Sequence, residues 1–198
     1  IMGLIKPQKG IINIFGKERK KEDDFKEVRR RIGMLFQDSD DQLFCPTVEE
    51  DIAFGPLNLG ISPKQIDYTV EQVCKILGLE KLKKKVTHKL SFGEKRLVAL
   101  ATVVAMKPEC FLFDEPTTGL DEETSNKFLQ YLHNYTDTYI IISHDISFLE
   151  KSVDKIYKIV NKRINIDKNY KFPDMPYLFT IRKCVHKRRK VIKGNHRI

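Results

Sequence analysis

Two acidic residues, Asp114 and Glu115, directly follow an apolar run at Cys110–Phe113. A short continuous apolar run predicts a strand that is buried on both faces. Ligands of parallel sheets bind at the carboxyl ends of the strands, so we expect the acidic pair at a binding edge. One carboxylate can hold a hydrated Mg²⁺ there, and the next can orient and polarise an attacking water. The alternative is a helix-capping Asp-Glu pair before the turn at Pro116.

Two further polar residues follow predicted strands and are expected on the same edge. His144 comes after the apolar strand at 139–142, and Gln37 comes after the strand at 32–36. A histidine at this edge can contact a γ-phosphate or respond to its loss. Taken alone, His144 is more typical of a structural or capping residue, and Gln37 of an ordinary turn.

The fourth candidate segment, Leu90–Glu94, opens a predicted helix at 91–107 that Pro108 ends. A helix N-terminus presents free N–H groups and a positive dipole, which favour phosphate. Gly93 allows close backbone approach, and Ser91 can donate its hydroxyl. The alternative is a plain capping box of Ser91 with Glu94, and both interpretations can hold together.

The order and spacing of these segments resemble the ATP-binding cassette (ABC) ATPase family, over about residues 1–165. The matching segments, in family order, are the Q-loop at Gln37, the signature motif at 90–94 with Glu94 where glutamine is commoner, Walker B with its catalytic glutamate at 111–115, the D-loop at 119–121 and the switch histidine at His144.

The resemblance implies ATP and Mg²⁺ as cofactors and assigns a role to each matching residue. The catalytic residues are Glu115 as general base, His144 at the γ-phosphate and Gln37 near the metal and water, and the metal-binding residues are Asp114 and Gln37. In this family two cassettes dimerise head to tail. The residues that contact the ATP held by the second cassette are Ser91, Gly93, Glu94 and Asp121.

Strands that alternate with helices predict an α/β fold with a mostly parallel sheet and helices on both faces. By resemblance this is a P-loop NTPase-like ABC ATPase core at 1–167, with a helical signature subdomain at about 47–100. Thr47 and Glu50 match a capping box and predict a helix start. The segments Lys155–Val160 and Arg163–Asp167 predict a terminal hairpin, and 168–198 are expected to form a basic C-terminal extension.

The charge of the chain is unevenly distributed. The net charge is +9, but 182–198 contain eight basic residues and no acidic residue, so the remainder is near neutral. A nucleic-acid-binding domain is therefore not expected. The basic segment either contacts anionic lipid or has no role. The longest apolar stretch, Leu97–Met106, has ten residues, too few for a membrane span. Cysteines and histidines form no metal-binding pattern, so no structural metal is predicted.

Two segments, Phe36–Phe44 and Pro46–Gly60, resemble the ATPases of energy-coupling-factor and cobalt/nickel importers. This resemblance implies an ATP-hydrolysing motor for the import of metal ions or vitamins. The implied partners are a second ABC ATPase subunit, in a homo- or heterodimer, and a transmembrane coupling subunit. The implied location is peripheral, at the cytoplasmic face of the cell membrane.

The family's Walker A loop has no match in this chain and is expected upstream of Ile1. Residues 2–10 resemble the family's segment after the Walker A helix, so we expect a fragment of an ordinary ATPase that binds ATP poorly by itself. One alternative is a degenerate cassette that completes a partner's ATP site. A DNA-associated ABC ATPase is disfavoured, since the chain lacks sustained heptads.

Overall fold

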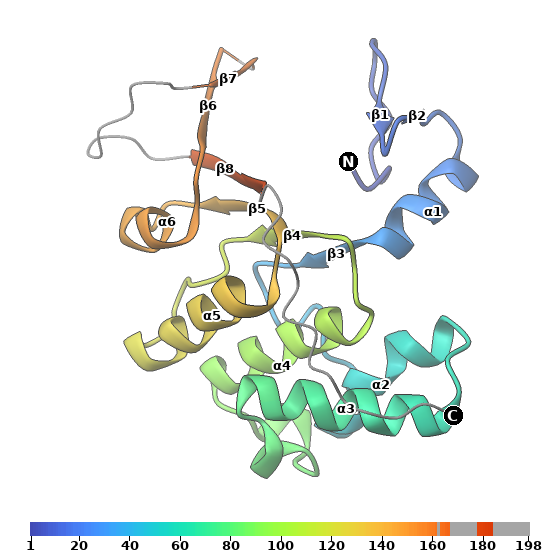
Figure 1. Cartoon of the computed structure of the whole chain (residues 1–198), viewed down its shortest axis with the longest axis vertical. Helices are drawn as coiled ribbons and strands as arrows, with labels where there is room; N and C mark the ends of the chain where they lie inside the picture. Colours follow the sequence, from blue (N-terminus) through green and yellow to red (C-terminus); the bar gives the residue numbers. More distant parts are fainter. Residues whose placement is uncertain (162, 167–177, 184–198) are drawn as a thin grey trace.

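The computed structural model describes residues 1–161, 163–166 and 178–183 (Figure 1). Its centre is a six-stranded sheet in the order β3-β4-β5-β8-β6-β7. The strands are β3 (Ile32–Leu35), β4 (Cys110–Asp114), β5 (Thr138–Ser143), β6 (Ile156–Val160), β7 (Arg163–Ile166) and β8 (Leu178–Lys183). A separate hairpin joins β1 (Asn13–Ile14) to β2 (Lys17–Glu18).

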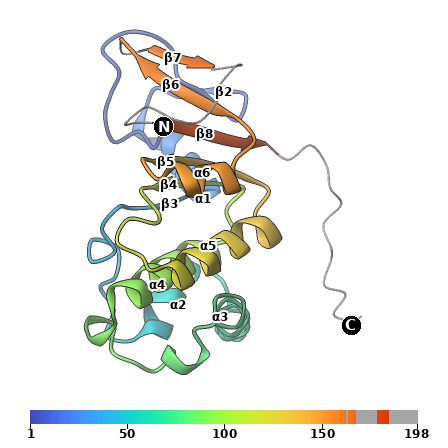
Figure 2. The same cartoon turned by 90° about the vertical axis from the view of Figure 1, so that its left-hand side faces the viewer.

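The strands β3, β4 and β5 pair in parallel, as their apolar runs predict. Alternate residues of these strands point to the two faces of the sheet. On the face toward α4 (Phe92–Ala105) and α5 (Glu122–Tyr135), side chains such as Leu35, Phe113 and Ile141 are buried. These helices lie together below the three parallel strands in Figures 1 and 2.

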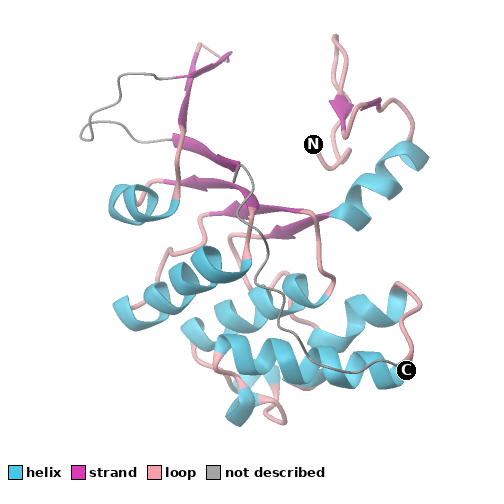
Figure 3. Cartoon of the chain, in the orientation of Figure 1, coloured by secondary structure: helices cyan, strands magenta, loops and turns pink. Residues whose placement is uncertain are grey.

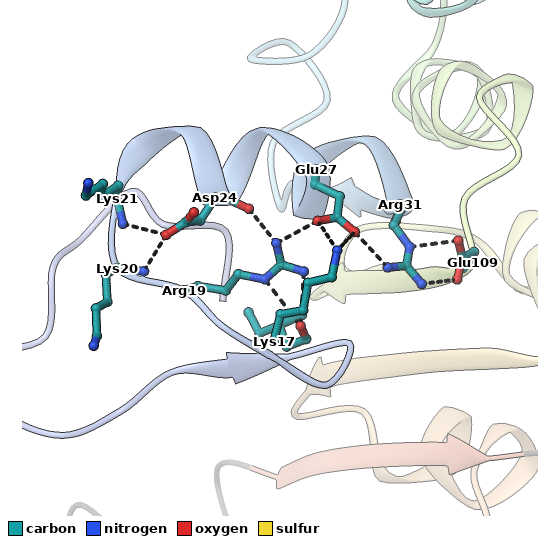
Figure 4. Close-up of polar contacts among 9 residues, drawn as sticks. Lys17, Arg19, Lys20, Lys21, Asp24, Glu27, Arg31 and Glu109 are labelled. Carbon is teal, nitrogen blue, oxygen red and sulfur yellow. Dashed lines mark hydrogen bonds and ion pairs between the residues drawn. The ribbon is translucent and has the colours of Figure 1, made fainter.

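The other face of β4 meets a smaller apolar cluster around α1 (Glu22–Arg31), formed by Phe25, Val28 and Ile32, with Leu112 packed against it. Ion pairs bind α1 to its surroundings (Figure 4). The buried Arg19 donates to Glu27 Oε2 at 2.8 Å and to the carbonyl oxygens of Ile14 and Asp24. The hydrogen bond from Arg19 lowers the pKa of Glu27 to about 2. The N-terminal hairpin and α1 therefore form one unit.

The helical layer contains α2 (Val48–Asn58), α3 (Pro63–Leu77), α4 and the short helices η1 (Glu80–Leu82) and η2 (Thr87–Lys89). Figure 3 shows these helices gathered on one side of the strands. The predicted capping box is confirmed, since Glu50 Oε2 accepts the Thr47 N–H at 2.9 Å. Pro63 begins α3, and Gly78, with a φ of 69°, ends it. After β5, α6 (Ile146–Ser152) leads into the predicted β6–β7 hairpin.

The sheet differs from the prediction in one strand, β8, and in the two pairings that β8 makes. Only β3, β4 and β5 are parallel, whereas the pairings of β8 with β5 and β6, and of β6 with β7, are antiparallel. β8 lies in the segment predicted as a basic extension, so the sheet continues past the expected domain limit at 167. Phe179 and Ile181 alternate with polar residues there, a strand pattern that the high charge of the segment obscures.

The remainder of the predicted C-terminal extension, 168–177 and 184–198, lies outside the described residues. Within the described part of the chain, no helix has the length and apolar character that crossing a membrane requires.

Candidate active site

The ends of β4 and β5 bring Glu115 and His144 into direct contact. Glu115 follows β4, His144 follows β5, and His144 Nδ1 lies 2.9 Å from Glu115 Oε2. The same oxygen accepts from the hydroxyls of Ser143, at 3.1 Å, and Thr118, at 3.3 Å. The Glu115 side chain is 11% exposed and that of His144 is 60% exposed. The carboxylate is thus held from several sides, while the imidazole is open to a ligand.

The electrostatics of the strand ends favour a bound cation and a charged imidazole. Burial, and then the neighbouring Glu115, raise the pKa of Asp114, the last residue of β4. A positive ion beside Asp114 would counter both effects. The hydrogen bond to Glu115, followed by its charge, raises the pKa of His144, so the protonated imidazole is favoured.

The backbone of Glu115 is strained. Its φ is 45°, in the left-handed region of backbone conformation that residues other than glycine seldom adopt. The Glu115 N–H donates to the carbonyl oxygen of Ile142 at 2.8 Å, which ties the strained residue to β5. Such conformations cost about 1–3 kcal/mol, persist only where surrounding contacts enforce them, and cluster at functional sites.

Gln37 lies two residues after Leu35, the last residue of β3, and it is exposed. Its carbonyl oxygen accepts from Arg96 Nη1 at 3.0 Å. Arg96 Nη2 also donates to the carbonyl oxygens of Asp114 and Glu115, at 3.0 and 2.9 Å. The backbones of Gln37 and of the acidic pair therefore meet around one guanidinium. Sequence reasoning missed Arg96, whose signal is a charged residue next to the apolar stretch at 97–106.

The four remaining predicted residues lie at the N-terminal ends of α4 and α5. Ser91 and Glu94 form a reciprocal capping box, in which the Ser91 N–H donates to Glu94 Oε2 at 2.7 Å. This backbone hydrogen bond is the main cause of the lowered pKa of Glu94. Asp121 caps α5 by accepting the Thr124 N–H at 2.7 Å, which lowers the pKa of Asp121.

The two helix ends also pack against each other. A Cβ atom added at Gly93 would lie 3.1 Å from Thr124 Oγ1 on α5. One added at Gly119, whose φ is 75°, would lie 2.9 Å from the Phe92 ring on α4. Both glycines thus permit a close approach between the start of α4 and the turn before α5.

Comparison with known proteins gives consistent matches. The family model described as "ABC transporter" matches residues 1–118. A putative ABC transporter ATP-binding protein of Nitratidesulfovibrio vulgaris is 48% identical over 76% of this chain and 55% of the relative. The energy-coupling factor transporter ATP-binding protein EcfA of Methanocaldococcus jannaschii is 40% identical over 82% of this chain and 60% of the relative. The chain thus spans little more than half the length of these two relatives.

Solved structures share the fold. The ATP-binding cassette MJ0796, solved as a dimer in a post-hydrolysis state bound to ADP and Pi, superposes with a TM-score of 0.74. It is 25% identical, and the match covers 87% of this chain and 78% of that one. CbiO1 from Clostridium perfringens, described as part of the ABC transporter complex cbiONQ, is 31% identical with a TM-score of 0.62 over 71% of this chain and 64% of that one.

Proposed function

Because the chain belongs to the ABC transporter family, we propose that it is part of an ATP-hydrolysing subunit that drives a membrane importer of the energy-coupling-factor type. The observation that carries the proposal is the contact between Glu115 and His144 beside Asp114, at the ends of adjacent parallel strands. The match to EcfA supports the energy-coupling-factor type, and metal ions or vitamins are the proposed cargo.

In the proposed reaction, Glu115 is the general base. Its carboxylate, held by Ser143 and Thr118, orients the attacking water and takes its proton. His144 keeps Nδ1 on Glu115 and has Nε2 free to donate to the γ-phosphate when the imidazole is protonated. Fixed donors of this kind stabilise the charge that develops on the transferred phosphoryl group.

The residues present fit a Mg²⁺ ion that is bound together with nucleotide. Asp114 offers hard oxygen ligands at the strand end, and the exposed Gln37 can supply an amide oxygen. Among the described residues, no group of three or more His, Cys, Asp and Glu could hold a metal ion by itself. Mg²⁺ suits such a site because it commonly uses one or two carboxylates plus phosphate oxygens and water. When bound, the ion would neutralise charge on the phosphates.

A second cassette is the proposed partner at the exposed starts of α4 and α5. Ser91, Gly93, Glu94 and Asp121 would contact the ATP held by that cassette, across a homo- or heterodimer interface. The dimeric structure of the related cassette MJ0796 supports this arrangement. The capping hydrogen bonds of Glu94 and Asp121 are compatible with this dimer, because a capping side chain also shapes the helix end that faces the ligand.

A transmembrane coupling subunit is the second proposed partner, which would hold the protein at the cytoplasmic face of the membrane. Exposed apolar side chains in and around α2 offer a surface for it: Phe44, Phe54, Leu57 and Leu59. The rings of Phe44 and Phe54 meet edge to face at 4.6 Å between centroids, so these two side chains hold each other in place.

The test is ATP hydrolysis by the full-length protein with its partners. Glu115→Gln keeps the shape of the side chain but removes the base, so we expect about a 10²–10⁴-fold fall in kcat with ATP binding retained. Glu109→Gln is the matched control, since that carboxylate pairs with Arg31 at the surface. An unchanged rate in Glu115→Gln would refute the proposal and favour a cassette that only completes a partner's site.

A further inference from the structure

Arg96 is buried in the first turns of α4, with 1% of its surface exposed. Its guanidinium donates five hydrogen bonds, and all five acceptors are main-chain carbonyl oxygens. The acceptors are Phe36 and Gln37 for Nη1, Asp114 and Glu115 for Nη2, and Pro116 for Nε. A side chain with every N–H committed in this way fixes the relative positions of its acceptors.

The acceptors belong to the two chain segments that carry the proposed chemistry. One is the end of β3, which leads to Gln37, and the other is the end of β4, which carries Asp114 and Glu115. Burial lowers the pKa of Arg96 to about 10, although the nearby charges of Asp114 and Glu115 act to raise it. Desolvation of this cation is therefore costly. The cost is offset by hydrogen bonds that only this local backbone geometry provides.

The strained residue lies in the middle of the group of acceptors. Glu115 has a φ of 45°, and Arg96 holds its carbonyl oxygen and those of the residues on either side. A left-handed conformation at a side-chain-bearing residue needs contacts of this kind to persist. Without them, the peptide can relax and carry the Glu115 carboxylate away from His144.

We propose that Arg96 is a positioning residue that holds Glu115 in its strained conformation and links it to the start of α4. The link is short, since Arg96 is only five residues after Ser91 on the same rigid helix. A displacement of this helix end, which contacts the partner's ATP in the proposed function, therefore moves the backbones of Gln37 and Glu115. The first part of the inference, the clamp on Glu115, is independent of ATP hydrolysis, and the second part rests on the proposed function.

The clamp is tested by hydrogen–deuterium exchange on the full-length protein without nucleotide. Arg96→Lys keeps the buried cation but cannot reach five carbonyls, and Arg96→Met keeps the volume and removes every donor. In both variants we expect the hydrogen-bonded amides of Glu115 and Thr118 to exchange about tenfold faster or more, because their local opening is easier. Leu100→Ala is the matched control, a buried α4 residue one turn after Arg96 whose truncation lowers stability but removes none of the hydrogen bonds of Arg96.

The consequence for chemistry is tested by ATP hydrolysis with the same variants. Misplacement of the base predicts a fall in kcat of about 10²-fold in Arg96→Met, a smaller fall in Arg96→Lys, and nearly unchanged KM for ATP. Leu100→Ala should keep its kcat at temperatures where it is folded.

The outcomes separate the inference from the proposed function. If the variants exchange faster but the wild-type protein does not hydrolyse ATP, the clamp is retained and the proposed function is refuted. Wild-type exchange and kcat in folded Arg96→Lys and Arg96→Met would overturn the clamp. So would failure of both variants to fold, because Arg96 would then support the whole domain rather than position Glu115.

Discussion

Asp51 anchors the loop that connects Gln37 to α2, and its removal should destabilise the domain measurably. Asp51 is 2% exposed, and its Oδ1 accepts the N–H groups of Phe44, at 3.1 Å, and Cys45, at 2.9 Å. Asp51→Ala leaves two partly buried N–H donors without their acceptor, at about 1–3 kcal/mol each, so we expect a loss of about 3 kcal/mol in the free energy of unfolding. Asp51→Asn keeps one acceptor oxygen and should cost about 1 kcal/mol.

Urea denaturation of the two variants measures these losses. The decisive result is that Asp51→Ala loses more free energy of unfolding than Asp51→Asn. A second readout is the reactivity of Cys45, because burial and the nearby Asp51 carboxylate raise the pKa of that thiol to about 11. Removing the carboxylate should lower the Cys45 pKa and speed its alkylation in the folded state, without reaching the rate of an exposed thiol. An Asp51→Ala variant within about 0.5 kcal/mol of wild type, the range of ordinary surface changes, would refute the reasoning.

Three further predictions concern charge, strain and burial. The pKa of His144 should lie above the ordinary histidine value of 6.5 in the folded protein. Its contact with Glu115 therefore contributes its full stabilisation below pH 6.5 and loses it as the pH rises through the folded pKa. NMR titration should show a lower His144 pKa in Glu115→Gln than in the wild type. Gly119→Ala should cost about 1–2 kcal/mol through its positive φ, plus a clash that Phe92→Ala relieves, as unfolding midpoints would show; a neutral Gly119→Ala argues against this turn geometry. Arg19→Met should cost about 2–4 kcal/mol in thermal unfolding because it removes the hydrogen bonds of a buried guanidinium to Glu27 and to the carbonyl oxygens of Ile14 and Asp24, and a loss under about 1 kcal/mol would contradict the network in Figure 4.

Local signals predicted the elements whose formation depends on nearby residues. The capping box of Thr47 with Glu50 involves groups only three positions apart. The three parallel strands were recognisable because burial on both faces requires continuous apolar runs. Their adjacency then placed Glu115 and His144 on one edge, although nothing in their spacing indicated a 2.9 Å contact.

Long-range contacts could not be predicted in the same way. Arg96 finds its acceptors 18 to 60 positions away, and a single arginine beside an apolar stretch does not specify main-chain partners. The positive φ of Glu115 likewise depends on those distant contacts. β8 could not be predicted from its charged composition. It forms because β5 and β6 supply hydrogen-bond partners for its backbone on both sides, and these partners are distant in sequence.

The insertion of the helical layer between β3 and β4 has a consequence for how the chain folds. Arg31 and Glu109, which form an ion pair where these strands begin, are 78 positions apart. Closing a flexible loop of that length costs about 4 kcal/mol of chain entropy. Helices that pack on one another before the strands meet shorten the effective loop, and α2 and α4 make extensive mutual contacts. Formation of the helical layer should therefore precede pairing of the parallel strands, so the edge that carries Glu115 is among the last parts of the molecule to assemble.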